Sequence, residues 1–90
     1  MAKITFSKVL SKKFNFNEGE FNICSDSLVD VIAKIDMEYP GFSECILDNE
    51  DKINGFICVF INDEMIDHNI RDVKLKNNDK VFIINRIAGG

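Results

Sequence analysis

The sequence predicts one α+β domain, in which a mixed sheet of four or five strands carries one main helix on one face. Residues 27–39 have the apolar spacing of a helix, and several apolar runs of strand length are separated by polar turns. The 90 residues are 46% hydrophobic, which is enough for a single compact core. The expected order is β-β-α-β-β-β, and one helix covers only one face of such a sheet.

The N-terminal segment predicts two strands. In residues 3–10, KITFSKVL, the side chains Ile4 and Phe6 alternate with Thr5 and Ser7, and this period of two is typical of a strand. The polar residues 17–20, NEGE, favour a turn. Residues 20–24, EFNIC, then form the second strand, which we expect to be the hairpin partner of the first.

Residues 27–39 predict the main helix. Ser27 is a natural N-cap, and Asp30 follows three residues later. Pro40 ends the helix, because the residue before a proline is forced out of helical geometry. The apolar face is formed by Leu28, Val31, Ile32 and Ile35.

The second half of the chain predicts a short helical turn and three strands. Residues 42–52 start as a helical turn and continue as a polar loop, and residues 55–61, GFICVFI, form a continuous apolar strand. A tight turn at 62–64 precedes a short strand at 65–66, and a polar turn at 75–79 precedes the last strand at 80–84.

The face of the sheet opposite the helix is expected to be apolar. Alternation in the last strand places Val81 and Ile83 on one face and Phe82 and Ile84 on the other. An apolar patch of this kind usually marks a protein-binding surface, so we expect Phe82, Ile84 and Met65 to dock a partner. Loops that fold back over the patch are the alternative.

Charge and composition exclude several classes of function. The net charge is −4 and no cluster of Lys or Arg exceeds a pair, so we expect no nucleic-acid binding. The N-terminus lacks a long apolar run, which argues against a membrane span. Three cysteines without a secretory pattern favour the cytoplasm. His68 has no Cys or second His nearby, so we expect no metal site.

Four motifs in order resemble one family. These are EYPGF at 38–42, VFINDE at 59–64, LKNNDKVFII at 75–84 and IAGG at 87–90. Together they resemble the MoaD/ThiS family of ubiquitin-like sulfur carriers with a β-grasp fold, over nearly the whole chain. The resemblance implies a β-grasp domain at residues 1–84 and a flexible tail at residues 85–90 that ends in the diglycine.

The resemblance also implies a reaction cycle at Gly90. A ubiquitin-activating-type adenylyltransferase uses ATP to adenylate the Gly90 carboxylate, and sulfur from a persulfide donor displaces AMP to leave a thiocarboxylate. A larger catalytic subunit or another acceptor enzyme then takes the sulfur. The chain itself is expected to bind no cofactor and to be no enzyme.

The composition of the tail suits such chemistry. A main-chain carboxylate that enters a buried ATP site needs a thin, extended approach, which Gly89 and Ala88 permit. Ile87 is expected to anchor the tail in an apolar groove, and Arg86 to lie where the tail meets the sheet.

The pathway stays open at the level of sequence. Chain length favours the small subunit of molybdopterin synthase in molybdenum cofactor biosynthesis, although this chain has Asn85 and Arg86 where such proteins often carry prolines. Carriers for cysteine, thiamine or tungsten cofactor synthesis and ubiquitin-like protein modifiers are the alternatives. A plain binding module, in which the diglycine does nothing, is a third class.

Overall fold

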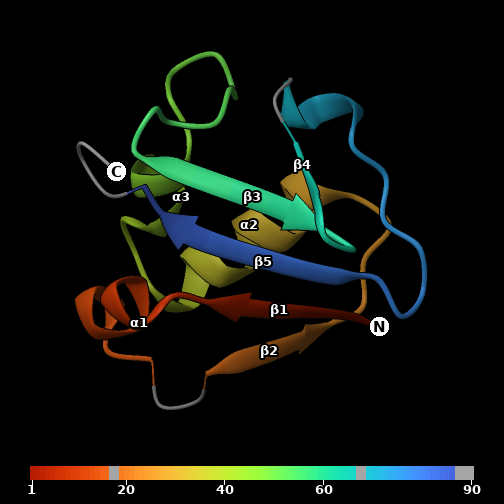
Figure 1. The fold of residues 1–90 in the computed structure, drawn as a ribbon, viewed down its shortest axis with the longest axis horizontal. Helices are drawn as coiled ribbons and strands as arrows, with labels where there is room; N and C mark the ends of the chain where they lie inside the picture. Colours follow the sequence, from red (N-terminus) through yellow and green to blue (C-terminus); the bar gives the residue numbers. More distant parts are fainter. Residues whose placement is uncertain (17–18, 67–68, 87–90) are drawn as a thin grey trace.

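A computed structural model describes residues 1–16, 19–66 and 69–86, and it confirms the β-grasp architecture (Figure 1). The elements are β1 (Ala2–Phe6), α1 (Lys8–Phe14), β2 (Glu20–Ile23), α2 (Leu28–Glu38), α3 (Phe42–Ile46), β3 (Ile57–Ile61), β4 (Glu64–Met65), the 3₁₀ turn η1 (Ile70–Asp72) and β5 (Lys80–Asn85).

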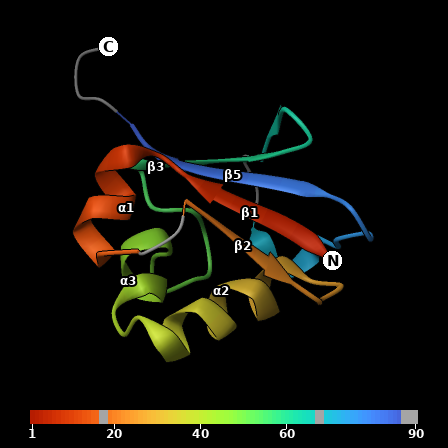
Figure 2. The same ribbon diagram turned by 90° about the horizontal axis from the view of Figure 1, so that it is seen from below.

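The five strands form one mixed sheet in the order β2-β1-β5-β3-β4. β1 runs parallel to β5, while the pairs β1–β2, β3–β5 and β3–β4 are antiparallel. The last strand along the chain is therefore the middle strand of the sheet. Seen edge-on, the sheet forms one layer and α2 and α3 form the other (Figure 2).

The main helix α2 begins and ends as its sequence predicts. The Ser27 side chain accepts a hydrogen bond from the Asp30 amide at 3.1 Å, which satisfies one free donor of the first turn. The four apolar residues of the predicted face are all buried against the sheet, where they meet Ile4, Val59, Val81 and Ile83.

The predicted first strand is too long, because a helix replaces its second half. β1 ends at Phe6, and Ser7 caps α1 by accepting a hydrogen bond from the Leu10 amide. Leu10 and Phe14 lie one turn apart and both face the interior. The β1–β2 pairing is confirmed, but α1 and the loop after it connect the two strands in place of a tight turn.

An aromatic cluster holds α1 against the rest of the domain. The rings of Phe14 and Phe42 lie 5.3 Å apart, and those of Phe6 and Phe16 lie 4.7 Å apart. Phe16 also meets Tyr39 edge-on at 4.7 Å. Aromatic pairs of this geometry contribute about 0.5–1.5 kcal/mol beyond their buried area, so the cluster fixes the position of α1.

The remaining predicted elements are confirmed in kind, although β3 starts at Ile57, two residues later than predicted, and β4 starts at Glu64, one residue earlier. Residues 42–46 form the short helix α3, and β4 follows a two-residue turn in which Asn62 and Asp63 have φ of 50° and 71°. Asn and Asp tolerate this left-handed conformation better than other residues with a side chain. None of the helices among the described residues is long and apolar enough to cross a lipid bilayer.

Candidate docking face and tail exit

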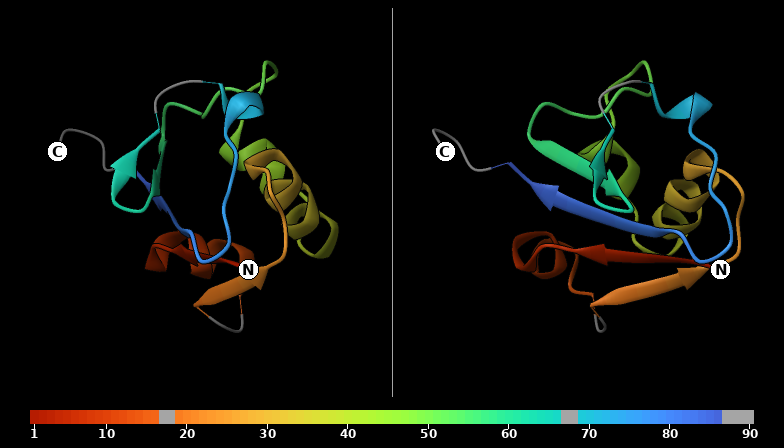
Figure 3. Two further views of the ribbon diagram at one scale, coloured as in Figure 1. Left: turned by 90° about the vertical axis from the view of Figure 1, so that its right-hand side faces the viewer. Right: turned by 45° about the vertical axis from the view of Figure 1, so that its right-hand side comes forward.

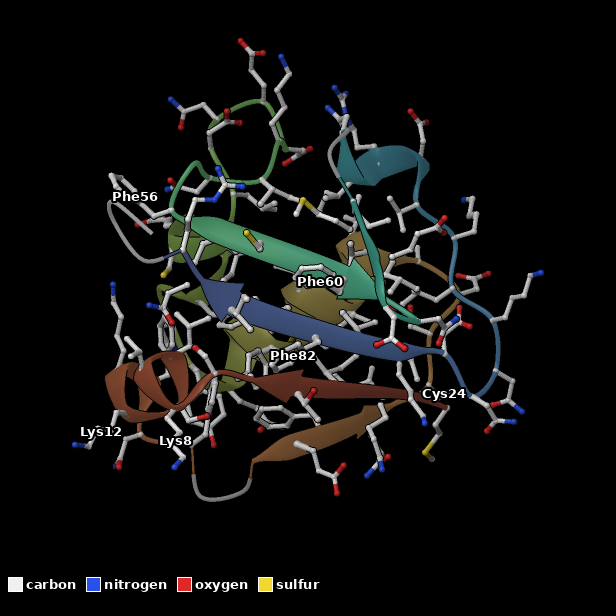
Figure 4. The ribbon with its side chains drawn as sticks, in the orientation of Figure 1. Lys8, Lys12, Cys24, Phe56, Phe60 and Phe82 are labelled. Carbon is white, nitrogen blue, oxygen red and sulfur yellow. The ribbon has the colours of Figure 1, made fainter. Side chains whose placement is uncertain are left out.

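The face of the sheet opposite α2 carries a row of apolar side chains that none of the helices in the described ranges covers (Figure 4). Phe60 of β3 pairs directly with Phe82 of β5 on one side and with Met65 of β4 on the other. Directly opposed residues share a face and touch, so the three side chains form a continuous strip across the sheet. Met65 and Phe82 are 50% and 43% exposed, which leaves the strip available to a partner.

The strip continues toward the end of the sheet where β5 terminates. Ile84 pairs with Cys58 of β3, and the Ile84 side chain is half-buried. Cys58 is buried, while Cys24 is exposed directly after β2. We call Phe60, Met65, Phe82 and Ile84 the docking face.

The chain leaves the sheet at a position fixed from both neighbouring strands. On the β3 side, the Arg86 amide donates a hydrogen bond to the Phe56 carbonyl at 2.6 Å. On the β1 side, the Ser7 hydroxyl donates to the Asn85 side-chain oxygen at 2.8 Å. Both bonds lie at the carboxyl end of β5, which we call the tail exit.

Two exposed groups flank the tail exit. The Phe56 side chain is 73% exposed, an unusual position for a large apolar group. The Arg86 guanidinium lies 3.4 Å from the Cys58 sulfur and so points back toward the sheet. Beside it lies a cavity of about 320 Å³ that is bordered by Lys52, Asn54 and Met65. The tail exit is therefore continuous with the docking face.

The structure brings together most of the side chains that the sequence singles out for docking. Phe82, Met65 and Ile84 lie on one face, and Arg86 lies at the edge of that face. Ile87, Ala88, Gly89 and Gly90 lie outside the described residues, as does His68. Among the described residues, no group of three His, Cys, Asp or Glu side chains is placed to hold a metal ion.

Sequence reasoning missed Phe56, and it named no particular residue of residues 55–61 for the docking face. A continuous apolar run has no alternation to show which side chains point to which face. The register supplies the missing information, because Phe56 lies opposite Arg86, one pair beyond Ile57 and Asn85.

The sequence matches no protein-family profile, and no curated protein matches it. Solved structures do match. A chain of the BexX/CysO complex of Amycolatopsis orientalis matches with a TM-score of 0.81 and 21% identity over 100% of both chains. Urm1 of Sulfolobus solfataricus matches with a TM-score of 0.68 and 27% identity, over 92% of this chain and 97% of that one.

Two further matches are to a molybdopterin-converting factor and to a protein modifier. A chain from the complex of subunits 1 and 2 of the molybdopterin-converting factor of Helicobacter pylori 26695 matches with a TM-score of 0.61 and 21% identity, over 99% of this chain and 97% of that one. The small archaeal modifier protein 1 of Methanosarcina acetivorans matches with a TM-score of 0.77 and 22% identity, over 99% and 95%. The chain therefore has the β-grasp fold of the ubiquitin-like sulfur carriers and modifiers, in agreement with the family that its motifs resemble.

Proposed function

We propose that this protein is a sulfur carrier that presents residues 87–90, the last four residues of the expected tail, to partner proteins. The observation that carries the proposal is the placement of the tail exit at the rim of an uncovered apolar face. A partner that docks on Phe60 and Phe82 also covers Arg86, the residue after which the tail begins. The sequence supplies IAGG at those positions.

The proposed chemistry proceeds in three steps at the Gly90 carbonyl. A carboxylate oxygen attacks the α-phosphorus of ATP, and pyrophosphate leaves. A persulfide sulfur of the donor attacks the carbonyl carbon of the resulting anhydride, and AMP leaves. A second thiol of the donor cleaves the sulfur–sulfur bond, which releases the thiocarboxylate and leaves a disulfide in the donor. ATP belongs to the activating adenylyltransferase and the persulfide to the donor system.

The same chemistry explains why the carrier needs no acid or base of its own. The anhydride gives the carbonyl a good leaving group, and the thiocarboxylate product is anionic and nucleophilic at neutral pH. The work of this chain is docking and presentation, for which the docking face and the tail exit are suited.

For the acceptor, we propose the larger subunit of molybdopterin synthase, as the length of the chain suggests. The match to a chain of the H. pylori molybdopterin-converting factor supports this choice. The match to a chain of the BexX/CysO complex supports a carrier that serves another acceptor protein. The fold is the same in both cases, so the acceptor decides the pathway.

The test is the intact mass of the protein after incubation with ATP, the activating enzyme of the same organism and a persulfide donor. We expect a gain equal to the exchange of one oxygen for sulfur. Deletion of Gly90 and the substitution Gly90→Ala should both abolish it while the thermal unfolding midpoint stays unchanged. A gain that persists in the deletion variant would refute the carrier function.

Protein modification is the second candidate, because the matched SAMP1 is named a modifier. Activation would begin identically, and a lysine amine would then replace sulfur as the nucleophile. Conjugates whose tryptic peptides carry a Gly-Gly remnant on lysine, formed with no gain of sulfur, would favour this candidate over the carrier.

A further inference from the structure

Helix α1 is a basic element on an acidic protein. Residues 7–16 hold Lys8, Lys12 and Lys13 and no Asp or Glu, while the whole chain has a net charge of −4. Within the described part of the chain, none of the three lysines forms an ion pair with an acidic side chain. Lys8 and Lys12 are exposed, and their spacing of four places them on the same side of the helix.

The sheet topology places this helix beside the tail exit. β1 is parallel to β5, so the chain leaves β1 at the same end at which it leaves β5. The Ser7 amide donates to the Ile83 carbonyl at 3.1 Å, and α1 starts at the next residue. α1 and the end of β5 lie at the same end of the molecule in Figure 2 and in the right-hand view of Figure 3. In Figure 4 Lys8 and Lys12 project at that end of the molecule from the side of α1 that faces away from β5 and Phe56.

The lysines border an apolar hollow. A shallow depression of about 660 Å³ separates α1 from the start of β2, and Phe6, Val9 and Phe16 contribute to its lining together with Lys8 and Lys12. Val9 is 58% exposed there. An apolar floor with a basic rim is suited to a segment that carries both apolar and carboxylate side chains.

We propose that α1 is a second docking element, and that Lys8 and Lys12 pair with carboxylates around the mouth of the channel through which the activating enzyme takes up the tail. The inference rests on the proposed function. An enzyme that encloses residues 87–90 must cover the tail exit on both sides, because the exit lies between Phe56 and Ser7. On the α1 side, the surface that the enzyme covers includes Lys8 and Lys12.

The charge of the partner follows from that of the helix. Acidic groups at the channel mouth attract α1 while the rest of this carrier repels them, so the pairing orients the carrier with its tail toward the channel. Paired charges of opposite sign raise the rate of encounter and suppress other orientations. The contribution depends on ionic strength, because salt screens exposed charges.

The experiment compares Lys8→Glu with Lys74→Glu. Each substitution changes the net charge of the chain by the same amount. The backbone of Lys74 forms an isolated β-bridge with Ser27, the N-cap of α2. The segment that follows Lys74 reaches the first residue of the chain, since the Asn78 amide donates to the Met1 carbonyl. Lys74 therefore lies at the opposite end of the sheet from the tail exit. Glutamate in the first turn of a helix is favourable, so Lys8→Glu leaves α1 folded, which circular dichroism would verify.

The measurement is the rate of ATP–pyrophosphate exchange that the activating enzyme of the same organism catalyses, as a function of carrier concentration. We expect Lys8→Glu to raise the KM for the carrier about fivefold or more while kcat is unchanged. The double variant Lys8→Glu/Lys12→Glu should show a larger effect. The difference in KM between these variants and the unchanged protein should fall steeply as the salt concentration rises toward 1 M, where the Debye length is about 3 Å.

Equal KM values for Lys8→Glu and Lys74→Glu would overturn the inference and leave the proposed function intact, since the unchanged protein would still be activated. A raised KM that is independent of salt would also overturn it, because the effect would then come from packing. Failure of the unchanged protein to support exchange would refute the proposed function, and the inference with it.

Discussion

The Arg86 amide donates a 2.6 Å hydrogen bond to the Phe56 carbonyl, which holds the last described residue of the chain to the residue that precedes β3. This bond continues the β3–β5 ladder by one pair beyond the strands themselves. The backbone of Asn85 and Arg86 is therefore held by the sheet, which fixes the position of the tail exit.

Phe82→Asp is expected to weaken partner docking more than it weakens folding. Phe82 is 43% exposed on the uncovered face, so a charge there remains hydrated in the free protein but is desolvated in the complex. We expect a loss of about 1–2 kcal/mol in unfolding free energy and a loss of binding to the activating enzyme of at least about tenfold. Urea unfolding and isothermal titration calorimetry measure the two effects.

Met37→Asp is the control for that prediction. Met37 is 83% exposed on α2, on the other side of the molecule, so its substitution should leave binding unchanged. Ile84→Asp should lower stability more than Phe82→Asp does, because Ile84 is half-buried against β3. Equal loss of binding in the Met37 and Phe82 variants would show that the docking face is not the interface.

Ser7→Ala is expected to loosen α1 and the tail exit together. The Ser7 side chain caps α1 and also donates to the Asn85 oxygen, so alanine removes both bonds. We expect a loss of about 1–2 kcal/mol in unfolding free energy and faster amide hydrogen exchange at residues 84–86. Ser27→Ala is the comparison, because Ser27 caps α2 alone and its loss should leave exchange at 84–86 unaltered.

Acid is expected to weaken the turn that precedes β5. Hydrogen bonds from the Lys76 amide and then from the Asn62 side chain lower the pKa of Asp79 below its ordinary value of 3.8. A lowered pKa means that the Asp79 contribution is present above pH 3.8 and is lost as the pH falls through the folded-state pKa. The difference in unfolding free energy between the unchanged protein and Asp79→Asn should be largest near neutral pH. It should shrink as the pH falls below 3.8. A constant difference from pH 7 to pH 2 would contradict the assignment.

Cysteine labelling is expected to follow burial. Cys24 is exposed and Cys58 is buried beside Ile84, so iodoacetamide should modify Cys24 first in the folded protein. Peptide mass spectrometry over a time course measures the order, and labelling in urea provides the reference in which all three thiols react. Faster labelling of Cys58 would mean that the docking face opens in solution.

The predictable parts of the fold are those in which local pattern and packing agree. In α2, the Ser27 cap and the spacing of four apolar residues predict a helix, and the same four residues pack into the core. In β5, burial alternates along Val81 to Ile84, as it does in a strand with one buried face. α1 could not be read in the same way: the alternation that predicts β1 breaks at Ser7 and Lys8, but Lys8–Phe14 is too short to display a clear helical repeat. The Ser7 cap and the contact of Phe14 with Phe42 decide in favour of the helix, and the second is a tertiary contact that the sequence does not display.

The central position of β5 has a consequence for synthesis of the protein on the ribosome. Among the described strands, β1 and β3 are joined within the sheet by β5, so the sheet cannot close until Asn85 has left the exit tunnel. A chain that is truncated before β5 lacks Val81 and Ile83 from its centre and cannot form the docking face. Such fragments are therefore expected not to compete with the complete chain for a docking partner.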